Sequence, residues 1–549
     1  MLNLPLDPTD DRAKPAFQDV ASCTRWLKQL QFTNLHVVHG VVRAQLDEFN
    51  RYPMQGLERL RTLELLRETV THLQTDYAKK IAARKLPLSE EEFTILASIT
   101  ALWQQMVNGY HRCLQSLLAG DKQLAPYGSL LCQRCLLHTS LQIFECLHNG
   151  YEFEGRLWQQ LHTLYAFCEE KNWPLEKLTQ LADGHLGNAA SCHVTYVKTL
   201  LGACVFPGEL SRAQLQLTDR LLLLWSATIT LDRHFTTSKG DAPPLAVDLA
   251  GSHGLEQTSK LAANQIDSIQ STVRYLPMLP LSKLLRVKII LLQQGQSPQQ
   301  LDLGDDCNST DCIALLKLLH RRWCAGSPDG TPRQHGAAKQ AQMCYGQMCY
   351  GIEMIYTRIA KKPSRSLDTD AGSDSLARKQ IATFGRVLSR DDRHDGKNTN
   401  PLLETWQIVE ENMLGAVMLR EGITDLRLSL KQIVAVQTVH AGAFILGAIS
   451  WLQVTQSGHL SAGVNYLPGI PQAVRISGMA AKSAQSVGAL LLPAVATLKI
   501  PSSLIIPRDW FAPERVIELA NRNHKQLKIK MGLSIEIGQD YERISFIPV

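Results

Sequence analysis

One place in the chain carries cysteine and histidine at a spacing that is typical of metal sites. Cys132 and Cys135 are separated by two residues, and His138 follows three residues later. A structural zinc site uses four such ligands, and the sequence contains no second Cys-x-x-Cys pair. The pair lies in an apolar helical run, where cysteine packs as a small buried hydrophobe. We therefore expect buried thiols here and no metal ion.

The sequence lacks the short motifs that assemble common catalytic sites. It contains no G-x-x-x-x-G-K-[ST] phosphate loop, no G-x-S-x-G turn for a nucleophilic serine and no H-E-x-x-H zinc motif. Nothing else in the chain gathers the side chains of an active site. We therefore expect no catalytic residues, no cofactor and a protein that is not an enzyme.

The composition is that of a soluble intracellular protein of about three to four domains. A net charge of +6, from 57 basic and 51 acidic residues, is too small for a general nucleic-acid binder, so we expect no DNA binding. The longest apolar runs, 441–454 and 487–498, fall short of the ~18 residues that span a bilayer. Thirteen scattered cysteines, an odd number, indicate reduced thiols in the cytoplasm rather than a disulfide framework.

The first part of the chain follows a helical pattern. Between residues 16 and 227, amphipathic segments alternate with short turns that contain Gly, Pro or Asn. Ser89 and Glu92 are spaced as a capping box at the start of one helix. The pattern predicts an all-α domain over residues 1–231, built as a bundle or a stack of helix pairs. Such a surface is suited to a protein partner.

The helical period is lost over residues 232–259, where Gly, Pro, Ser and Asp predict a linker. Helices return over 260–325 and lead into the second half of the chain. We expect residues 326–480 to form a β-barrel, with a flexible insertion at 361–400 because that stretch is polar and rich in Gly, Ser and Asp. Residues 481–549 predict a further small β module.

The barrel prediction rests on residues 430–469. Three runs of β-branched, leucine and aromatic residues are broken there by turns that contain glycine, which predicts an antiparallel meander. A sheet this small must curl to hide its apolar face, and a small barrel is the simplest solution. We expect at least six strands between residues 404 and 549. The predicted fold class is therefore α+β and multidomain.

Residues 310–549 resemble the PilZ domain, the bacterial barrel that binds cyclic-di-GMP. The resemblance lies in a basic helix end, an arginine loop, a strand with Trp406, and the runs VAVQ, LGAISWL and LSAGVNYLPG in that order. It implies a PilZ-like antiparallel β-barrel behind a long helical region. The function that it implies is that of a non-enzymatic, cytoplasmic bacterial regulator.

The first PilZ motif is an R-x-x-x-R loop, whose guanidinium groups contact the phosphates and guanines of the ligand. Here Arg333 is present, but Ala337 stands where the second arginine belongs. Arg321 and Arg322 lie just upstream and Lys339 just downstream, so these residues are further candidate ligand contacts. Arg321 and Arg322 end a helix, where the helix dipole favours basic side chains in any case.

The second PilZ motif is a D/N-x-S-x-x-G turn beside the guanine. Glu410, Asn412 and Gly415 occupy its three defined positions, so only the glycine matches. Glu410 and Asn412 are candidate ligand contacts, although both also suit a turn, and Gly415 suits tight backbone geometry with or without a ligand. The carboxylates of Glu410 and Glu411 would repel phosphate unless arginines neutralise them.

Two functions stay open at this point. The first is a regulator that responds to cyclic-di-GMP or derives from such a receptor, in which the ligand reorients the barrel and the helices. The second is a degenerate PilZ-like protein that binds no nucleotide and acts as a protein–protein interaction scaffold. Because the motifs are altered, we expect weak cyclic-di-GMP binding or none.

Overall fold

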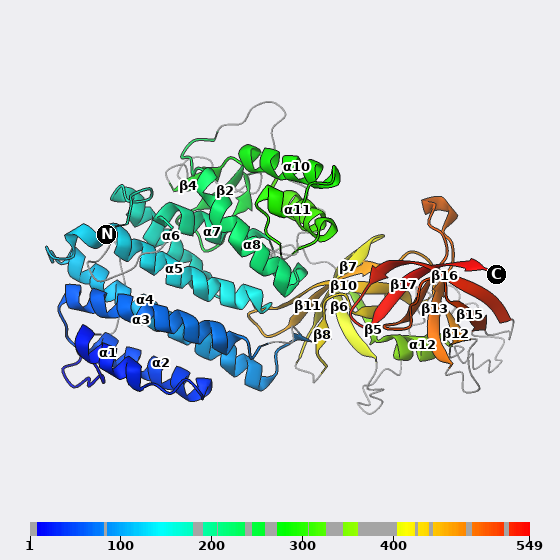
Figure 1. The fold of residues 1–549 in the computed structure, drawn as a ribbon, viewed down its shortest axis with the longest axis horizontal. Coiled ribbons are helices and arrows are strands. Elements are labelled where there is room, and N and C mark those ends of the chain that lie inside the picture. Colours follow the sequence, from blue (N-terminus) through cyan, green and yellow to red (C-terminus); the bar gives the residue numbers. More distant parts are fainter. Residues whose placement is uncertain are drawn as a thin grey trace, which may run out of the picture. The chain divides into compact units, whose positions relative to one another are not determined.

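A computed structural model describes most of the chain (Figure 1). The described residues are 8–81, 85–178, 190–205, 207–235, 244–258, 272–305, 307–324, 344–360, 403–422, 426–438, 443–478, 486–520 and 526–549. They divide into two compact units. The first, here called the helical unit, contains residues 8–81 and 88–324. The second, here called the barrel unit, contains residues 85–87 and 344–549.

The helical unit is built largely from α-helices, as the sequence predicted. Their bounds are α1 (Val20–Gln29), α2 (Leu35–Arg51), α3 (Gly56–Ala78), α4 (Glu90–Leu118), α5 (Gly128–His148), α6 (Gly155–Glu170), α7 (Cys192–Cys204), α8 (Arg212–Trp225), α10 (Leu279–Gln293) and α11 (Ser309–Cys324). Helices α3, α4 and α5 lie side by side at its centre (Figure 1).

Local sequence signals explain where several of these helices begin. The predicted capping box is present, because the Ser89 backbone N–H donates to the Glu92 carboxylate (2.9 Å) and the Glu92 N–H donates to Ser89 Oγ (3.3 Å). Similar boxes start α1 at Asp19 and α8 at Ser211. Each satisfies backbone N–H groups that have no partner within the helix.

A three-stranded antiparallel sheet lies where the sequence predicted a linker and a helix. Strand β2 (Leu245–Asp248) pairs with β3 (Glu256–Gln257) and with β4 (Val273–Leu276). Ala246, Val247 and Val273 are buried in it. The strands were missed because each has two to four residues, which is too short for an alternation pattern to stand out from loop composition.

The barrel unit contains two closed, six-stranded antiparallel barrels. The first has the order β10-β11-β7-β6-β5-β9 and the second the order β12-β13-β14-β17-β16-β15. The bounds are β5 (Cys344–Tyr350), β6 (Glu404–Asn412), β7 (Gly415–Arg420), β9 (Ile433–Thr438), β10 (Ile445–Val454), β11 (Leu460–Tyr466), β12 (Gln472–Gly478), β13 (Val487–Leu492), β14 (Ser503–Pro507), β15 (Val516–Ala520), β16 (Gln526–Ile537) and β17 (Tyr541–Pro548).

The predicted meander is confirmed as β9, β10 and β11, which pair in sequence order. Trp451 of β10 lies opposite Gly463 of β11 and is buried against it, as expected for a core residue. The structure places β12 in the second barrel, whereas the sequence boundary at residue 480 had left it in the first. Its alternating pattern shows a buried face but does not reveal its partners, which are β13 and β15.

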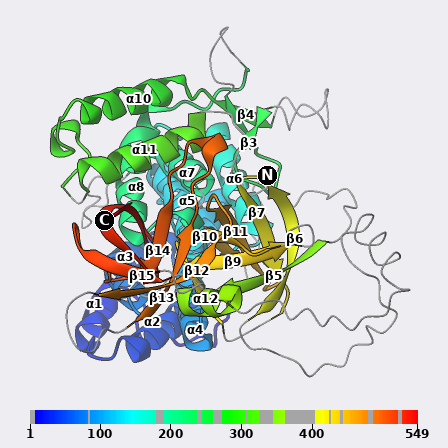
Figure 2. The ribbon, with the colours of Figure 1, turned by 90° about the vertical axis from the view of Figure 1, so that its right-hand side faces the viewer.

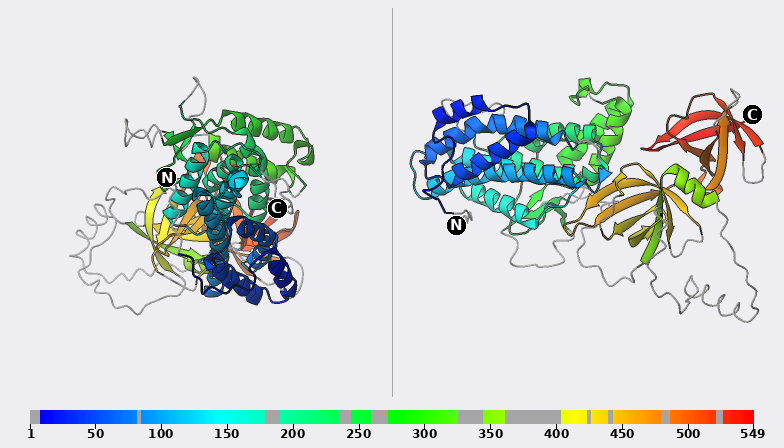
Figure 3. Two further views of the ribbon diagram at one scale, coloured as in Figure 1. Left: turned by 90° about the vertical axis from the view of Figure 1, so that its left-hand side faces the viewer. Right: turned by 90° about the horizontal axis from the view of Figure 1, so that it is seen from below.

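Helix α12 (Ile352–Ala360) follows β5 directly and packs against strands of both barrels (Figure 2; Figure 3, right). Its Ile352 and Ile355 share one apolar core with Ile433 of β9 and Leu490 of β13. The second barrel has a separate core of its own, around Val474, Ile506, Ile517 and Ile544.

One short strand interrupts the helical part of the sequence. Strand β1 (Lys85–Leu86) pairs with β8 (Leu428–Ser429) and belongs to the barrel unit. Arg427 donates from Nε to the Pro87 carbonyl (3.1 Å) and from Nη2 to the Lys85 carbonyl (3.2 Å). The prediction of an all-α domain over residues 1–231 was therefore wrong at this point. A two-residue strand leaves no periodic signal.

Two further expectations concern membrane-spanning helices and the cysteines. None of the helices in the described ranges combines the length and apolar character that a bilayer crossing demands. Cys307 and Cys312, five residues apart, form a disulfide with a Cα–Cα distance of 6.0 Å. The other eleven cysteines are free. The predicted insertion at 361–400 lies outside the described residues.

Candidate functional site

The β6–β7 hairpin carries the three described residues of the predicted ligand motif. Asn412 ends β6 and pairs with Gly415, which begins β7, so Met413 and Leu414 form the turn. The Asn412 Oδ1 accepts hydrogen bonds from the backbone N–H groups of Leu414 (2.8 Å) and Gly415 (3.1 Å). Asn412 therefore stabilises the turn, and its side-chain oxygen already accepts two hydrogen bonds within the hairpin.

Gly415 is required by a close approach between neighbouring strands. A Cβ atom at this position would lie 2.1 Å from the backbone oxygen of Val464 in β11. That separation is far below van der Waals contact, so a side chain here would force β7 and β11 apart. The glycine therefore has a structural role that does not depend on a ligand.

Two carboxylates flank the turn. Glu410 is exposed and lies at a bulge in the β6–β7 ladder, opposite Val417. Glu411 accepts a hydrogen bond from the Tyr466 hydroxyl (2.9 Å), and burial together with this carboxylate raises the pKa of Tyr466. Neither glutamate forms an ion pair with any residue in the described part of the barrel unit. A phosphate bound here would need cations from elsewhere.

The predicted basic residues are not gathered at the hairpin by the structure. Arg322 is nearly buried in the helical unit, where its Nη2 contacts the Glu209 carboxylate. This ion pair gives Arg322 a structural role. Arg321 is exposed at the same end of α11. Arg333 and Lys339 lie outside the described residues, so their position stays a prediction.

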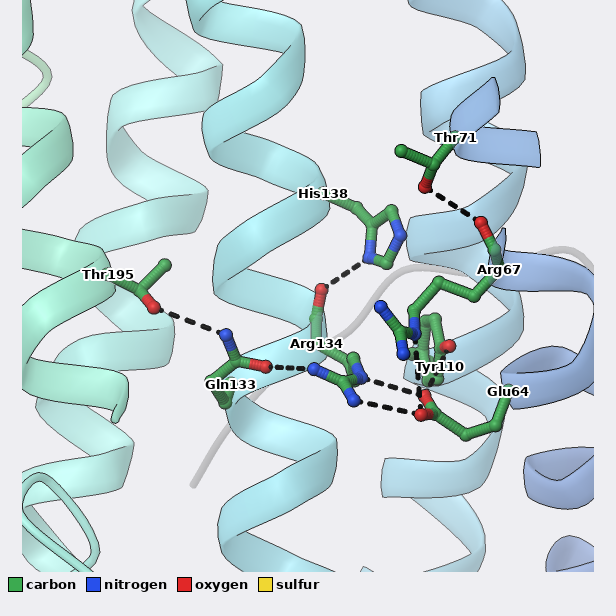
Figure 4. Close-up of polar contacts among 8 residues, drawn as sticks. All are labelled: Glu64, Arg67, Thr71, Tyr110, Gln133, Arg134, His138 and Thr195. Atoms are coloured by element: carbon green, nitrogen blue, oxygen red, sulfur yellow. Dashed lines mark hydrogen bonds and ion pairs between the residues drawn. The ribbon is translucent and has the colours of Figure 1, made fainter. Parts of the chain in front are cut away.

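A buried polar cluster in the helical unit was not anticipated from the sequence (Figure 4). Arg134 of α5 is 1% exposed and donates two hydrogen bonds to Glu64 of α3, from Nε (2.7 Å) and Nη2 (2.8 Å). The Tyr110 hydroxyl of α4 donates to the same carboxylate (2.7 Å). Arg134 Nη1 also donates to Gln133, whose amide reaches Thr195 of α7 (3.2 Å).

Electrostatics fix the charge states in this cluster. Burial acts to raise the pKa of Glu64, but the hydrogen bonds and charge of Arg134 outweigh it, so the pKa is lowered and the carboxylate is ionised. Burial raises the pKa of Tyr110 well above its usual range, which keeps the phenol protonated. Burial also lowers the pKa of His138 to about 4, so this imidazole is neutral at pH 7.

A cavity of about 330 Å³ opens beside the cluster. Arg67, Arg134 and Lys198 line it, and none of the described lining residues carries a carboxylate. The nearby Glu64 carboxylate is bonded to Arg134. Arg67 Nε is buried without a hydrogen-bond partner and lies 3.4 Å from Glu64. The remaining lining mixes polar and apolar side chains, namely Gln133, Leu137, Ser140, Leu141, Phe144, Ala190, Thr195, Thr199 and Leu223. This combination suits a small anion with an apolar part.

The sequence of α5 contains one indication of this cluster. Helix α5 is buried over almost its whole length, and Gln133, Arg134, His138, Thr139 and Ser140 are buried polar residues within it. Polar side chains on the apolar face of a central helix need partners. Their presence therefore indicates a polar network or a site, although not its ligand.

The Cys-x-x-Cys pair separates in the structure. Cys132 approaches Cys168 and Cys192, whereas Cys135 is not part of that group. His138 directs Nδ1 to the Arg134 carbonyl (2.7 Å) and stacks on Tyr110, with ring centroids 5.2 Å apart. The Cys-x-x-Cys and His138 spacing therefore does not form a shared ligand set.

Comparison with known proteins adds two family matches. Residues 21–236 match the model described as "Cyclic-di-GMP receptor FimW, N-terminal domain", and residues 472–549 match the model of the "FimW C-terminal beta-barrel domain". The second match covers the second barrel, from β12 to β17. Neither match confirms the PilZ resemblance. No curated protein matches the chain.

One solved structure is similar to part of the chain. It is described as "MrkH, A novel c-di-GMP dependence transcription regulatory factor". The alignment has 9% sequence identity and covers 41% of this chain and 91% of that chain, with a TM-score of 0.13. A similarity at this level supports no conclusion about this protein.

Proposed function

We propose that the protein is a cyclic-di-GMP receptor, because residues 21–236 and 472–549 match the models of the N-terminal and C-terminal β-barrel domains of FimW, which is described as a cyclic-di-GMP receptor. It acts as a non-enzymatic bacterial regulator in the cytoplasm. The single observation that carries this proposal is the pair of family matches in the order of the two domains. The absence of common catalytic motifs from the sequence supports the non-enzymatic role.

The first candidate for the ligand site is the β6–β7 hairpin of the first barrel. Arg333 and Lys339 supply the phosphate contacts in this proposal. The carboxylate of the exposed Glu410 repels phosphate, and these two cations must offset that repulsion.

The second candidate is the cavity beside Arg134. Three cations line it, whereas Arg420 of the described hairpin is already paired with Glu404. Its volume of about 330 Å³, however, lies at the lower end of the roughly 300–1,000 Å³ found for ligand pockets. A cyclic dinucleotide has two bases, two riboses and two phosphates, so this cavity would enclose only part of it. For that reason we favour the barrel surface for the whole ligand.

The proposed mechanism is a shift between two arrangements of the protein. Cyclic-di-GMP binds one arrangement more tightly and increases its population, which is the only way in which a ligand can move such an equilibrium. The helical unit then presents its surface to a protein partner in one of the two states.

The prediction that the protein does not bind DNA is separate, and a mobility-shift assay with the purified protein tests it.

Calorimetric titration of the purified full-length protein with cyclic-di-GMP tests the function and the site together. Loss of the second motif arginine removes a charge-assisted hydrogen bond of roughly 1.5–3 kcal/mol, so we expect binding that is one to two decades weaker than an intact motif would give. Arg333→Ala should abolish the remaining heat, whereas Lys198→Ala should leave it unchanged.

The other outcomes of this titration are equally informative. Binding that survives Arg333→Ala but is lost in Lys198→Ala moves the site to the helical cavity. Tight binding that survives both substitutions shows that neither candidate site is correct. A wild-type protein that gives no heat contradicts the receptor function.

A protein-interaction scaffold is the alternative function, and two apolar surfaces favour it. Met413 and Leu414 are 95% and 81% exposed at the hairpin tip. Leu533, Ile535 and Ile537 alternate along β16 and are also exposed. Exposed apolar groups on a soluble domain often mark contacts with other proteins. This alternative gains support if the wild type gives no heat with cyclic-di-GMP.

A further inference from the structure

Three cysteine sulfurs meet in the interior of the helical unit. The Sγ atoms of Cys132 in α5, Cys168 in α6 and Cys192 in α7 all lie within 4.8 Å of one another. All three residues are fully buried. They come from three different helices, so the packing of the fold brings them together rather than a local sequence motif.

The separation of the sulfurs suits one metal ion held by three thiolates. Zinc–sulfur bonds are about 2.3 Å long, which places three sulfurs around a shared ion roughly 4 Å apart. Small side-chain movements from the observed positions reach that geometry. The thiol of Cys132 lies 3.5 Å from the Leu164 carbonyl and that of Cys192 lies 3.4 Å from the Ser129 carbonyl. Metal binding therefore displaces only weak S–H hydrogen bonds.

Charge favours a divalent over a monovalent ion at this site. Three thiolates around a monovalent ion carry a net charge of −2, whereas around a divalent ion they carry −1, and excess charge is costly in a buried site. Cys192 is the first residue of α7, where the helix dipole places about half a positive charge. The dipole partly offsets the remaining −1.

From this geometry and charge balance we propose that Cys132, Cys168 and Cys192 bind one thiophilic divalent ion with a filled d shell, of which Zn²⁺ is the biological example. Each thiol releases its proton when the ion binds. Within the described part of the chain, no fourth Cys, His, Asp or Glu joins the group. The described residues thus supply three ligands, and the ion ties α5, α6 and α7 together.

Metal analysis of the untagged, full-length protein tests the proposal directly. We expect about one equivalent of zinc in protein purified under reducing conditions without chelator. After the metal is removed, titration with Cd²⁺ should produce a thiolate-to-metal charge-transfer band that saturates at one equivalent. The ion should also raise the thermal unfolding temperature of the wild type, because it binds only the folded protein.

Cys135→Ser provides a matched control for the three ligand substitutions. Cys135 is also fully buried and lies on the same helix as Cys132, but its sulfur is outside the group. We expect Cys132→Ser, Cys168→Ser and Cys192→Ser each to lose the Cd²⁺ band, and Cys135→Ser to keep it. Wild-type protein that holds no zinc and gives no band overturns the proposal, whatever the variants do. Equal loss of the band in Cys135→Ser overturns it as well.

Discussion

At the scale of single residues, the buried pair of Glu64 and Arg134 makes a strong prediction about stability. Glu64→Gln keeps the shape of the side chain but leaves the Arg134 charge, 1% exposed, without its partner. Breaking a buried ion pair in this way costs about 3–5 kcal/mol. Urea unfolding, monitored by far-ultraviolet circular dichroism, should show this loss of stability. Glu68→Gln, at an exposed position of the same helix, is the control and should change the free energy of unfolding by less than about 0.5 kcal/mol.

His111 of α4 makes the stability of the helical unit sensitive to acid. Burial lowers its pKa to about 4, against about 6.5 in the unfolded chain. Because the folded pKa is the lower one, the unfolded state takes up the proton first, and stability present above pH 6.5 is lost as the pH falls towards 4. Because of this histidine, the free energy of unfolding should be about 2–3 kcal/mol lower at pH 4.5 than at pH 7.5.

Replacing His111 should reduce that sensitivity. His111→Leu is expected to narrow the difference in the free energy of unfolding between pH 7.5 and pH 4.5 by about 2–3 kcal/mol. His72→Leu, the same substitution at an exposed position on α3, is the matched control for the effect of the substitution itself. An unchanged pH dependence in His111→Leu would mean that His111 is protonated in the folded protein.

Residue types predicted local roles better than they predicted partners. Asn412 and Gly415 could be read as turn residues because turn chemistry depends on neighbours in sequence. Arg322 looked like a free helix-end cation, but its partner Glu209 lies more than a hundred residues away, and such a pairing is set by the fold. For the same reason, the sequence did not indicate that Cys132 lies close to Cys168 and Cys192.

At the scale of elements, the β6–β7 hairpin gives a prediction about strand packing. Gly415→Ala places a methyl group 2.1 Å from the Val464 oxygen, and the strands can accept it only by moving apart. We expect the free energy of unfolding of the barrel unit to fall by about 1–3 kcal/mol. Leu414→Ala, in the same turn but 81% exposed, should have little effect. Equal stabilities for the two variants would show that β11 is able to shift.

Element types were predictable where the pattern was long, and strand partners were not. The capping box at Ser89 and the meander of β9 to β11 followed from spacing and alternation. Closure of the first barrel depends on β5, which pairs with β6 and with β9 far along the chain. Alternation within one strand carries no information about such distant partners, so the assignment of β12 to a barrel could not be made from sequence.

At the scale of the whole molecule, hydrogen exchange can locate the ligand. A ligand at 100 times its dissociation constant stabilises the part that binds it by about 2.7 kcal/mol. With cyclic-di-GMP we expect slower amide exchange in β6 and β7, and unchanged exchange in α3 and α5. Protection confined to α3, α5 and α7 would place the ligand in the cavity beside Arg134 instead.

The pairing of β1 with β8 has a consequence for the order of events during synthesis. Arg427 reaches the Pro87 carbonyl across 340 residues of sequence, so residues 85–87 leave the ribosome long before their partners exist. The helices that flank them can form at once, since helix formation needs only neighbouring residues. Lys85 and Leu86 must wait until the first barrel has been translated. This two-residue strand, although it lies near the start of the chain, thus pairs only after the first barrel has been made.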